Sequence, residues 1–212
     1  MMRMKTRLKR ALLLSLVLIF LLSVPTLAAS KKKKAMKAYA RFLSKSILYQ
    51  DRYHEGRSSF QINLKSPYCR CSIIYLNKDS IPELMIMHPS SHAAGYGSLY
   101  TYYKGNVRFV SKIDSPGGYY KKKAVLPDAY SNQGTINITY YYFNGKNLTP
   151  ILYQGGHLDY NDNVSWRYFN KKHKQISRSK FNVLLKKRIK RAKSRSMLFW
   201  RNTADNREKY LK

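Results

Sequence analysis

The spacing of apolar and polar residues predicts a helix at each end of the chain. Near the N-terminus, apolar residues recur at steps of three and four, which is the helical period. They are Met36, Tyr39, Ala40, Leu43 and Ile47. Residues 178–192 show the same period after Ser177, a good helix N-cap. Their apolar stripe consists of Phe181, Leu184, Leu185, Ile189 and Ala192. Asn202 or Thr203 is expected to cap a last short helix that ends near Tyr210.

Between these helices the pattern changes to short apolar segments separated by turns, which is typical of antiparallel strands. The segments cover residues 69–76, 83–87, 99–103, 107–110, 136–143 and 148–153. Asn144-Gly145 and Lys104-Gly105-Asn106 indicate hairpins, and Val164, Trp166 and Tyr168 alternate with polar residues. The sequence therefore predicts an α+β domain, with an antiparallel meander of about seven or eight strands preceded by one helix and followed by two helices.

The N-terminus has the three parts of a secretory signal peptide. Five basic residues precede an apolar run of twelve residues, 11–22, and Pro25 and Ala28 follow. The alternative is an uncleaved anchor, but the run is short for a membrane span of about 20 residues. We expect residues 1–28 to be a signal peptide, with cleavage after Ala28 or Ala29. Residues 29–34 would form a Lys-rich tether, and residues 35–212 a single domain with basic C-terminal helices.

The charge of the chain is extreme. It has 41 Lys and Arg against 10 Asp and Glu. Five of the basic residues lie in the predicted signal peptide, so the remaining chain has a net charge of +26. Solubility does not require so much charge of one sign. For an exported protein the expected partners are anionic: cell-wall phosphate polymers, acidic glycans, lipid head groups or extracellular nucleic acid.

The basic residues are concentrated toward the C-terminus. From residue 167 to residue 212 there are seventeen Lys and Arg and two acids. Opposite the apolar stripe of the 178–192 helix are Lys186, Lys187, Lys190 and Lys193. These four are the candidate polyanion-binding residues. The alternative is a solvated helix face, but such a face usually mixes both signs of charge.

Residues 75–87 resemble a calcium-binding loop that precedes a strand. Asn77, Asp79 and Glu83 occupy ligand positions of such a loop. The first, sixth and twelfth positions are instead Tyr75, Ser80 and Ile86, whereas Ca²⁺ requires six to eight oxygen ligands. We expect a turn in which Asp79 hydrogen-bonds to its own backbone. No metal and no cofactor are predicted.

This segment is similar to the D-x-D-G-D-G-I-P-E-L-L motif of uncharacterised secreted proteins of Gram-positive anaerobes. These proteins also have a signal peptide, a Lys-rich start, Tyr-rich hairpins such as residues 100–107, and a basic C-terminal helix. The motifs match at residues 73–87 and 99–107. The resemblance implies a lineage and a secreted or cell-wall location in a Gram-positive bacterium, and it implies no reaction.

Other candidate chemistry is weaker. His88 and His92 have metal-chelating spacing, but Pro89 lies between them and favours a loop. Asp159 and Asp162 could serve a glycoside hydrolase only across a cleft, and they lie in one turn-forming segment. Cys69 and Cys71 are expected to be small buried residues without a disulfide, because a strand holds them too far apart.

The sequence thus favours a secreted, non-enzymatic module that adheres to anionic polymers through a Lys- and Arg-rich face. It is expected to be monomeric, without specific nucleic-acid binding and with at most peripheral membrane contact. Two alternatives remain open: a glycan hydrolase that uses Asp159 or Asp162, and a membrane-active protein that uses its cationic helix.

Overall fold

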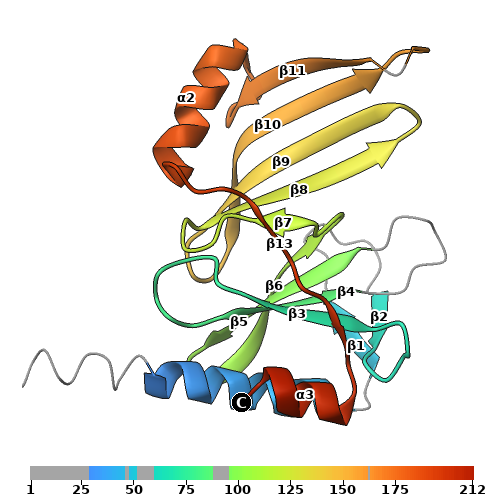
Figure 1. The fold of residues 1–212 in the computed structure, drawn as a ribbon, viewed down its shortest axis with the longest axis vertical. Coiled ribbons are helices and arrows are strands. Elements are labelled where there is room, and N and C mark those ends of the chain that lie inside the picture. Colours follow the sequence, from blue (N-terminus) through green and yellow to red (C-terminus); the bar gives the residue numbers. More distant parts are fainter. Residues whose placement is uncertain (1–28, 46–47, 52–59, 88–95, 162) are drawn as a thin grey trace, which may run out of the picture.

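The computed structural model describes residues 29–45, 48–51, 60–87, 96–161 and 163–212. The predictions about the signal peptide, His88, His92 and Asp162 lie outside these residues. Within them the protein is an α+β fold with one early helix, two later helices and antiparallel sheets, as the pattern predicts (Figure 1).

The lower sheet of Figure 1 has five strands in the order β14-β3-β4-β5-β6. Their bounds are β14 Trp200–Arg201, β3 Arg70–Ile74, β4 Glu83–Met87, β5 Gly97–Tyr103 and β6 Asn106–Ile113. The helix of residues 29–44 and helix α3, Ala204–Tyr210, lie below this sheet. The edge strand β14 comes from near the C-terminus, so the two ends of the described chain meet in one layer.

Side chains of the first helix form the core beneath the lower sheet. Tyr39 and Leu43 are fully buried there with Leu84 and Tyr100. The Tyr39 hydroxyl donates a hydrogen bond to the Pro82 carbonyl oxygen at 2.7 Å, which satisfies a polar group that burial would otherwise leave unpaired.

The C-terminal segment is attached to this layer by the half-buried side-chain amide of Asn202. The Nδ2 of Asn202 donates to the carbonyl oxygens of Leu43 and Leu64, at 3.0 and 2.7 Å. Asn202 therefore connects the end of the first helix, the residue after β2 and the start of α3. Of the two predicted caps of α3, Asn202 and Thr203, the structure confirms Thr203, because its Oγ1 accepts from the backbone N–H of Asn206.

The upper sheet has five strands in the order β12-β11-β10-β9-β8. Their bounds are β12 Gln175–Ile176, β11 Val164–Asn170, β10 Leu148–Leu158, β9 Thr135–Phe143 and β8 Val125–Asn132. Its lower end packs on the lower sheet, where Leu126 and Phe143 are buried with Ile74, Met85 and Leu99. This second core joins the two sheets.

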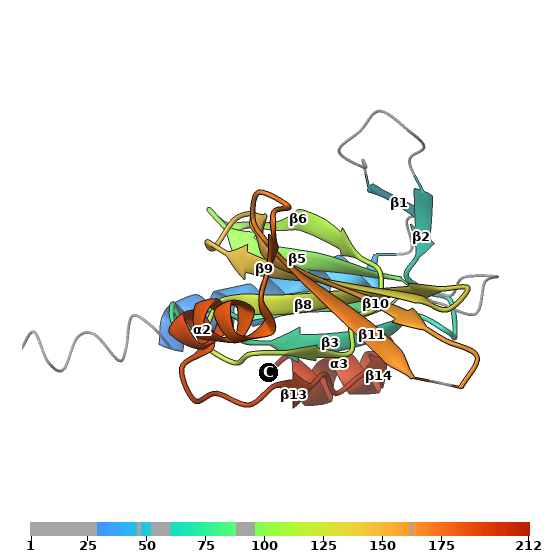
Figure 2. The same ribbon diagram turned by 90° about the horizontal axis from the view of Figure 1, so that it is seen from above.

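Two short ribbons complete the described fold. β13, Arg195–Ser196, pairs with β7, Gly118–Tyr119, beside the junction of the sheets. β1, Leu48–Asp51, pairs with β2, Phe60–Asn63, and Figure 2 shows this ribbon projecting beyond the two sheets.

Both predicted hairpins are confirmed. β5 and β6 are joined by Lys104 and Gly105, whose φ angles of 48° and 88° are both positive, as a tight two-residue hairpin loop requires. Gly145 between β9 and β10 has a φ of 93°. The preceding Asn144 accepts hydrogen bonds from the backbone N–H groups of Lys146 and Asn147 through its Oδ1.

Two expectations need correction, and one strand was not predicted. The strands form two five-stranded sheets and two ribbons in the described residues, rather than one meander of seven or eight. Residues 29–34 are helical with exposed side chains, not a separate tether, because Lys is a good helix former and Ala35 and Met36 are buried. Strand β8 is absent from the predicted segments; it lies at the edge of the upper sheet, where its Pro127 is tolerated.

Candidate functional site

Helix α2, Arg178–Ile189, is fixed on one face of the upper sheet by its apolar stripe. The Phe181 ring packs against Tyr140 of β9 and Tyr168 of β11, with ring centroids 5.6 and 5.0 Å apart. The Ser177 Oγ accepts from the backbone N–H of Lys180 at 3.2 Å, which confirms the predicted N-cap. Phe181 and Ile189 are buried, so the opposite side of the helix faces solvent.

The structure places the four predicted lysines at and beyond the end of α2. Lys186 and Lys187 lie in its last turn, and all four side chains are exposed. Lys190 is the C-cap, with a φ of 57°, and its backbone N–H donates to the Lys186 carbonyl oxygen at 2.7 Å. Lys193 lies in the chain after the helix. The expectation of one continuous helix face over residues 178–192 is therefore wrong for Lys190 and Lys193, because the left-handed residue ends the helix early.

Part of this positive charge has a structural role. Cations in the last turn of a helix interact favourably with its macrodipole, by about 0.3–1 kcal/mol each. The first turn has the opposite preference, yet it contains Arg178 and Lys180 and no acid. Helix stability alone therefore does not account for the basic composition of α2.

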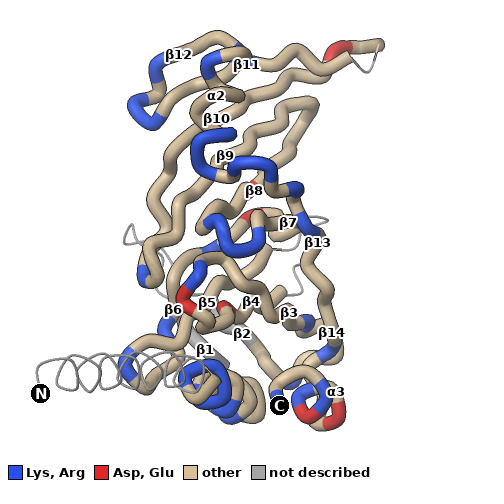
Figure 3. The backbone as a smooth tube through the Cα atoms, turned by 60° about the vertical axis from the view of Figure 1, so that its left-hand side comes forward, with Lys and Arg blue, Asp and Glu red and all other residues tan. Residues whose placement is uncertain are grey.

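A groove lies between the second half of α2 and the upper sheet. It has a volume of about 340 Å³, and the residues that line it include Lys171, Lys172 and Arg188 and no acid. Its apolar part is formed by Ile151 and Leu152 of β10 and Leu184 of α2. Figure 3 shows Lys and Arg along α2, the adjacent turn and the chain that follows the helix.

Two contacts orient polar groups of the groove. The guanidinium carbon of Arg188 lies 5.0 Å from the ring centroid of Tyr142, within cation–π range. Asn170 Oδ1 accepts the backbone N–H groups of Lys172 and Lys174, at 2.9 and 3.2 Å. That geometry shapes the turn carrying Lys171 and Lys172. It also leaves the Asn170 Nδ2 without a protein acceptor among the described residues.

This groove is not apparent from the sequence. Arg188 is exposed, and its guanidinium carbon lies over the Tyr142 ring. Lys171 and Lys172 were noted only as part of a basic region. The pairing of β11 with β10 brings this turn near Ile151, and no local sequence pattern reports that pairing.

Four of the described acids, Asp79, Glu83, Asp128 and Asp159, are engaged in turns or buried. Asp79 accepts the backbone N–H of Ile81 through Oδ1 and the Asn77 amide through Oδ2, at 2.9 and 2.8 Å. Asp159 Oδ1 accepts the backbone N–H groups of Asn161 and Asn163 at 2.8 and 2.9 Å. No ion pair is found for the cations of α2 within the described residues. The positive charge of this helix therefore remains uncompensated.

The loop at residues 77–83 has the expected turn geometry. Ser80 has a φ of 67°, so it occupies the left-handed conformation in which the related motif has glycine. Glu83 is fully buried and its Oε2 accepts the backbone N–H of Leu76 at 2.8 Å. Burial raises the pKa of this carboxyl well above its usual value, with a smaller contribution from Asp79. No group of three potential metal ligands occurs among the described residues.

The local environments of Asp159, Cys69 and Cys71 indicate structural rather than catalytic roles. Hydrogen bonds from Asn163 and Asn161 lower the pKa of Asp159, which is unfavourable for a general acid. Cys69 and Cys71 are both buried, as predicted, and both are free. Burial raises the pKa of the Cys71 thiol, so it is not an activated nucleophile.

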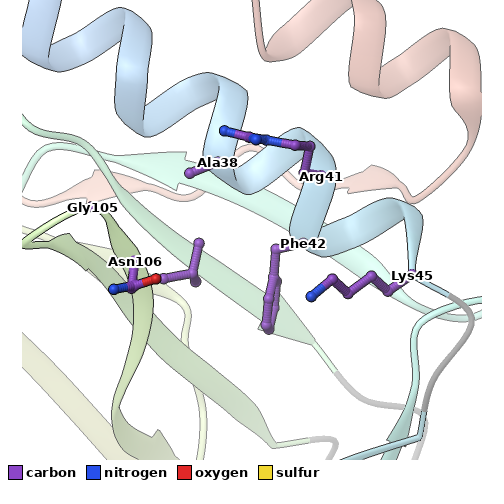
Figure 4. Close-up of a pocket in the computed structure, with 7 residues that line it drawn as sticks. Ala38, Arg41, Phe42, Lys45, Gly105 and Asn106 are labelled. Carbon is purple, nitrogen blue, oxygen red and sulfur yellow. The ribbon is translucent and has the colours of Figure 1, made fainter.

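A second groove of about 350 Å³ lies between the first helix and the β5–β6 hairpin. Figure 4 shows Lys45 extending toward the Phe42 ring, with Asn106 across the groove and Arg41 along the helix. Phe42 is 8% exposed and packs on Tyr100 at 5.1 Å, so it belongs chiefly to the core. The described residues that line this groove include two cations, Arg41 and Lys45.

Comparison with protein-family models, with curated proteins and with solved structures finds no match to the chain. Among the described helices, none is both long and apolar enough to cross a membrane.

Proposed function

We propose that this protein is a secreted, non-enzymatic module that adheres to anionic polymers through the basic surface of α2. We define this surface as the four exposed lysines at the end of the helix together with the adjacent groove. The expected ligands are phosphate-containing polymers or acidic glycans of a Gram-positive cell envelope. The secreted location rests on the predicted signal peptide, and the Gram-positive lineage rests on the sequence resemblance.

One observation carries the proposal: the cations of α2 and its groove have no acidic partner in the described residues. Surface lysines that serve only solubility usually alternate with acids. Here residues 163–204 contain no acid at all. A polymer that brings many phosphates to such a surface releases counterions from both partners, so binding is expected to be strong at low salt and weak at high salt.

The test is binding of long-chain polyphosphate to two variants with the same net charge. In the first, Lys186, Lys187, Lys190 and Lys193 are changed to Gln. In the second, four exposed lysines of the first helix are changed to Gln: Lys31, Lys33, Lys34 and Lys37. Gln is close to Lys in helix propensity, so both helices are retained.

The first variant is expected to bind more weakly and with a shallower salt dependence, by up to about one unit of slope per lost phosphate contact by analogy with nucleic acids. The second variant should keep most of the native affinity. An equal loss of affinity in both variants would mean that only net charge matters. No loss of affinity in the first variant would show that the α2 surface does not bind the polymer.

The structure requires a stability control, because the last-turn lysines also interact with the helix dipole. The first variant removes Lys186 and Lys187 from the last turn, so it should lose up to about 2 kcal/mol of unfolding free energy. Leu184 is only half-buried, so Leu184→Ala should lose less than the roughly 2–5 kcal/mol typical of a fully buried leucine. Binding is therefore compared at a temperature where all the variants are folded.

A further inference from the structure

The groove beside α2 differs chemically from the lysine surface around it. Lysines on a solvated face offer charge alone, whereas this groove combines a cationic rim with an aliphatic floor. Ile151, Leu152 and Leu184 come from two elements that the chain brings together only through tertiary packing. Leu152 is buried, and Ile151 and Leu184 are partly exposed to the groove.

Contacts within the protein restrict two side chains of the rim, Arg188 and Asn170. The Arg188 guanidinium carbon lies over the Tyr142 ring, and this contact reduces the freedom of a long side chain. The Asn170 amide is held through its Oδ1 by two backbone N–H groups, so its Nδ2 can donate to a ligand. With Lys171 and Lys172 in the same turn, the rim offers donors to several oxygens of one anion.

A polyanion without apolar groups would use the rim and leave the floor in water. A hydrocarbon would contact the aliphatic floor, but it would also remove the charged rim groups from water without offering them a partner. Both parts are used only by an amphiphile whose single anionic group is joined to a short apolar group. The volume, about 340 Å³, is at the small end of the range of small-molecule sites.

We propose that the groove binds the phosphate of an alkyl phosphate monoester, with the first few methylene groups of the chain lying on Ile151 and Leu184. The phosphate lies among Arg188, Lys171 and Lys172. This proposal rests on the proposed function for its location on the α2 surface, but it names a separate ligand class and a separate set of residues.

The test is a series of soluble probes measured by calorimetry or by NMR titration: inorganic phosphate, ethyl phosphate, butyl phosphate and hexyl phosphate. Each methylene that leaves water for the floor should increase affinity by about fourfold. The increase should stop once the chain exceeds the groove. Hexanol, which lacks the phosphate, should not bind measurably.

The residue test separates the two parts of the site. Arg188→Gln with Lys172→Gln should weaken every probe, inorganic phosphate included. Ile151→Thr, which replaces part of the floor on a partly exposed strand position, should flatten the chain-length dependence and leave inorganic phosphate unchanged. Lys31→Gln with Lys37→Gln, on the first helix, is the charge-matched control and should change neither.

The outcomes distinguish this proposal from the function proposed above. Equal affinity for inorganic phosphate and hexyl phosphate would overturn the amphiphile site, even if polyphosphate still bound to α2. Chain-length dependence that survives Ile151→Thr would also overturn it, because the apolar contact would then lie elsewhere. Tight, chain-length-dependent binding with no polyphosphate binding would support the groove and refute the polymer function.

Discussion

The buried carboxyl of Asp128 should make the stability of the protein depend on pH. Its side chain is 8% exposed, and its Oδ1 accepts the backbone N–H groups of Asp114 and Ser115 at 2.8 and 3.0 Å. Burial is the main cause that raises the pKa of this carboxyl from 3.8 to about 6, and the two N–H donors oppose it only in part. The folded protein therefore holds this proton more tightly than the unfolded chain.

Because the pKa of Asp128 is higher in the folded protein than in the unfolded chain, its contribution to stability decreases as pH rises. A group whose pKa is higher in the folded state stabilises the protein below the pKa of the unfolded chain, and this stability is lost as pH rises through the folded-state pKa. The shift of about two units corresponds to about 2–3 kcal/mol, since one unit is 1.36 kcal/mol. The loss should occur between about pH 4 and pH 7.

The perturbation is Asp128→Asn, which keeps the accepting Oδ1 and cannot ionise. Urea unfolding followed by tryptophan fluorescence, at fixed ionic strength from pH 4 to pH 7, gives the unfolding free energy of both proteins. The free energy of the variant minus that of the native protein should rise by about 2–3 kcal/mol over this range. Glu83, whose pKa is raised in the same direction, titrates in both proteins and cancels from the difference.

A difference that stays constant with pH would refute the reasoning, because it would mean that Asp128 is as well solvated in the folded state as in the unfolded chain. A difference that falls with pH would show that the two N–H donors and the positive charge of the protein outweigh burial.

Three further predictions use other parts of the chain. Millimolar Ca²⁺ should leave the melting temperature unchanged, because both Asp79 oxygens are already hydrogen-bonded; a rise that Asp79→Ala abolishes would contradict this. Gly156→Ala should cost about 1–3 kcal/mol of unfolding free energy, since the added Cβ would lie 2.8 Å from Trp166, whereas Gly155→Ala, with its nearest contact at 3.5 Å, should cost less. Intact mass of the protein recovered from culture medium should show cleavage after Ala28 or Ala29, and a full-length chain held in the membrane would refute export.

Local sequence patterns predicted the elements whose causes are local. Ser177 and Thr203 cap helices because their hydroxyls accept a backbone N–H three residues later, a relation that the sequence contains. The turns at Lys104-Gly105 and Asn144-Gly145 need positive φ, which glycine supplies without a side-chain clash. The apolar stripe of α2 likewise predicted that Phe181 and Ile189 are buried.

The errors have non-local causes. The edge position of β8 makes Pro127 acceptable, and only the strand order reveals that edge. The division into two sheets depends on Leu126 and Phe143 packing against Ile74 and Leu99, a long-range contact without a sequence signal. The groove is formed jointly by β10, the turn after β11 and α2. The sequence shows each of its basic and apolar residues, but it does not show that they lie side by side.

The central claim is that the protein binds anionic polymers by the attraction of an uncompensated cationic surface. The most direct measurement is the affinity of the native protein for long-chain polyphosphate as a function of salt, beside a neutral glycan of similar length. We predict that the logarithm of the polyphosphate association constant falls linearly with the logarithm of salt concentration, with a slope of several units, and that the neutral glycan does not bind. Absence of polyphosphate binding at low salt, or an affinity for it that does not change with salt, would contradict the account.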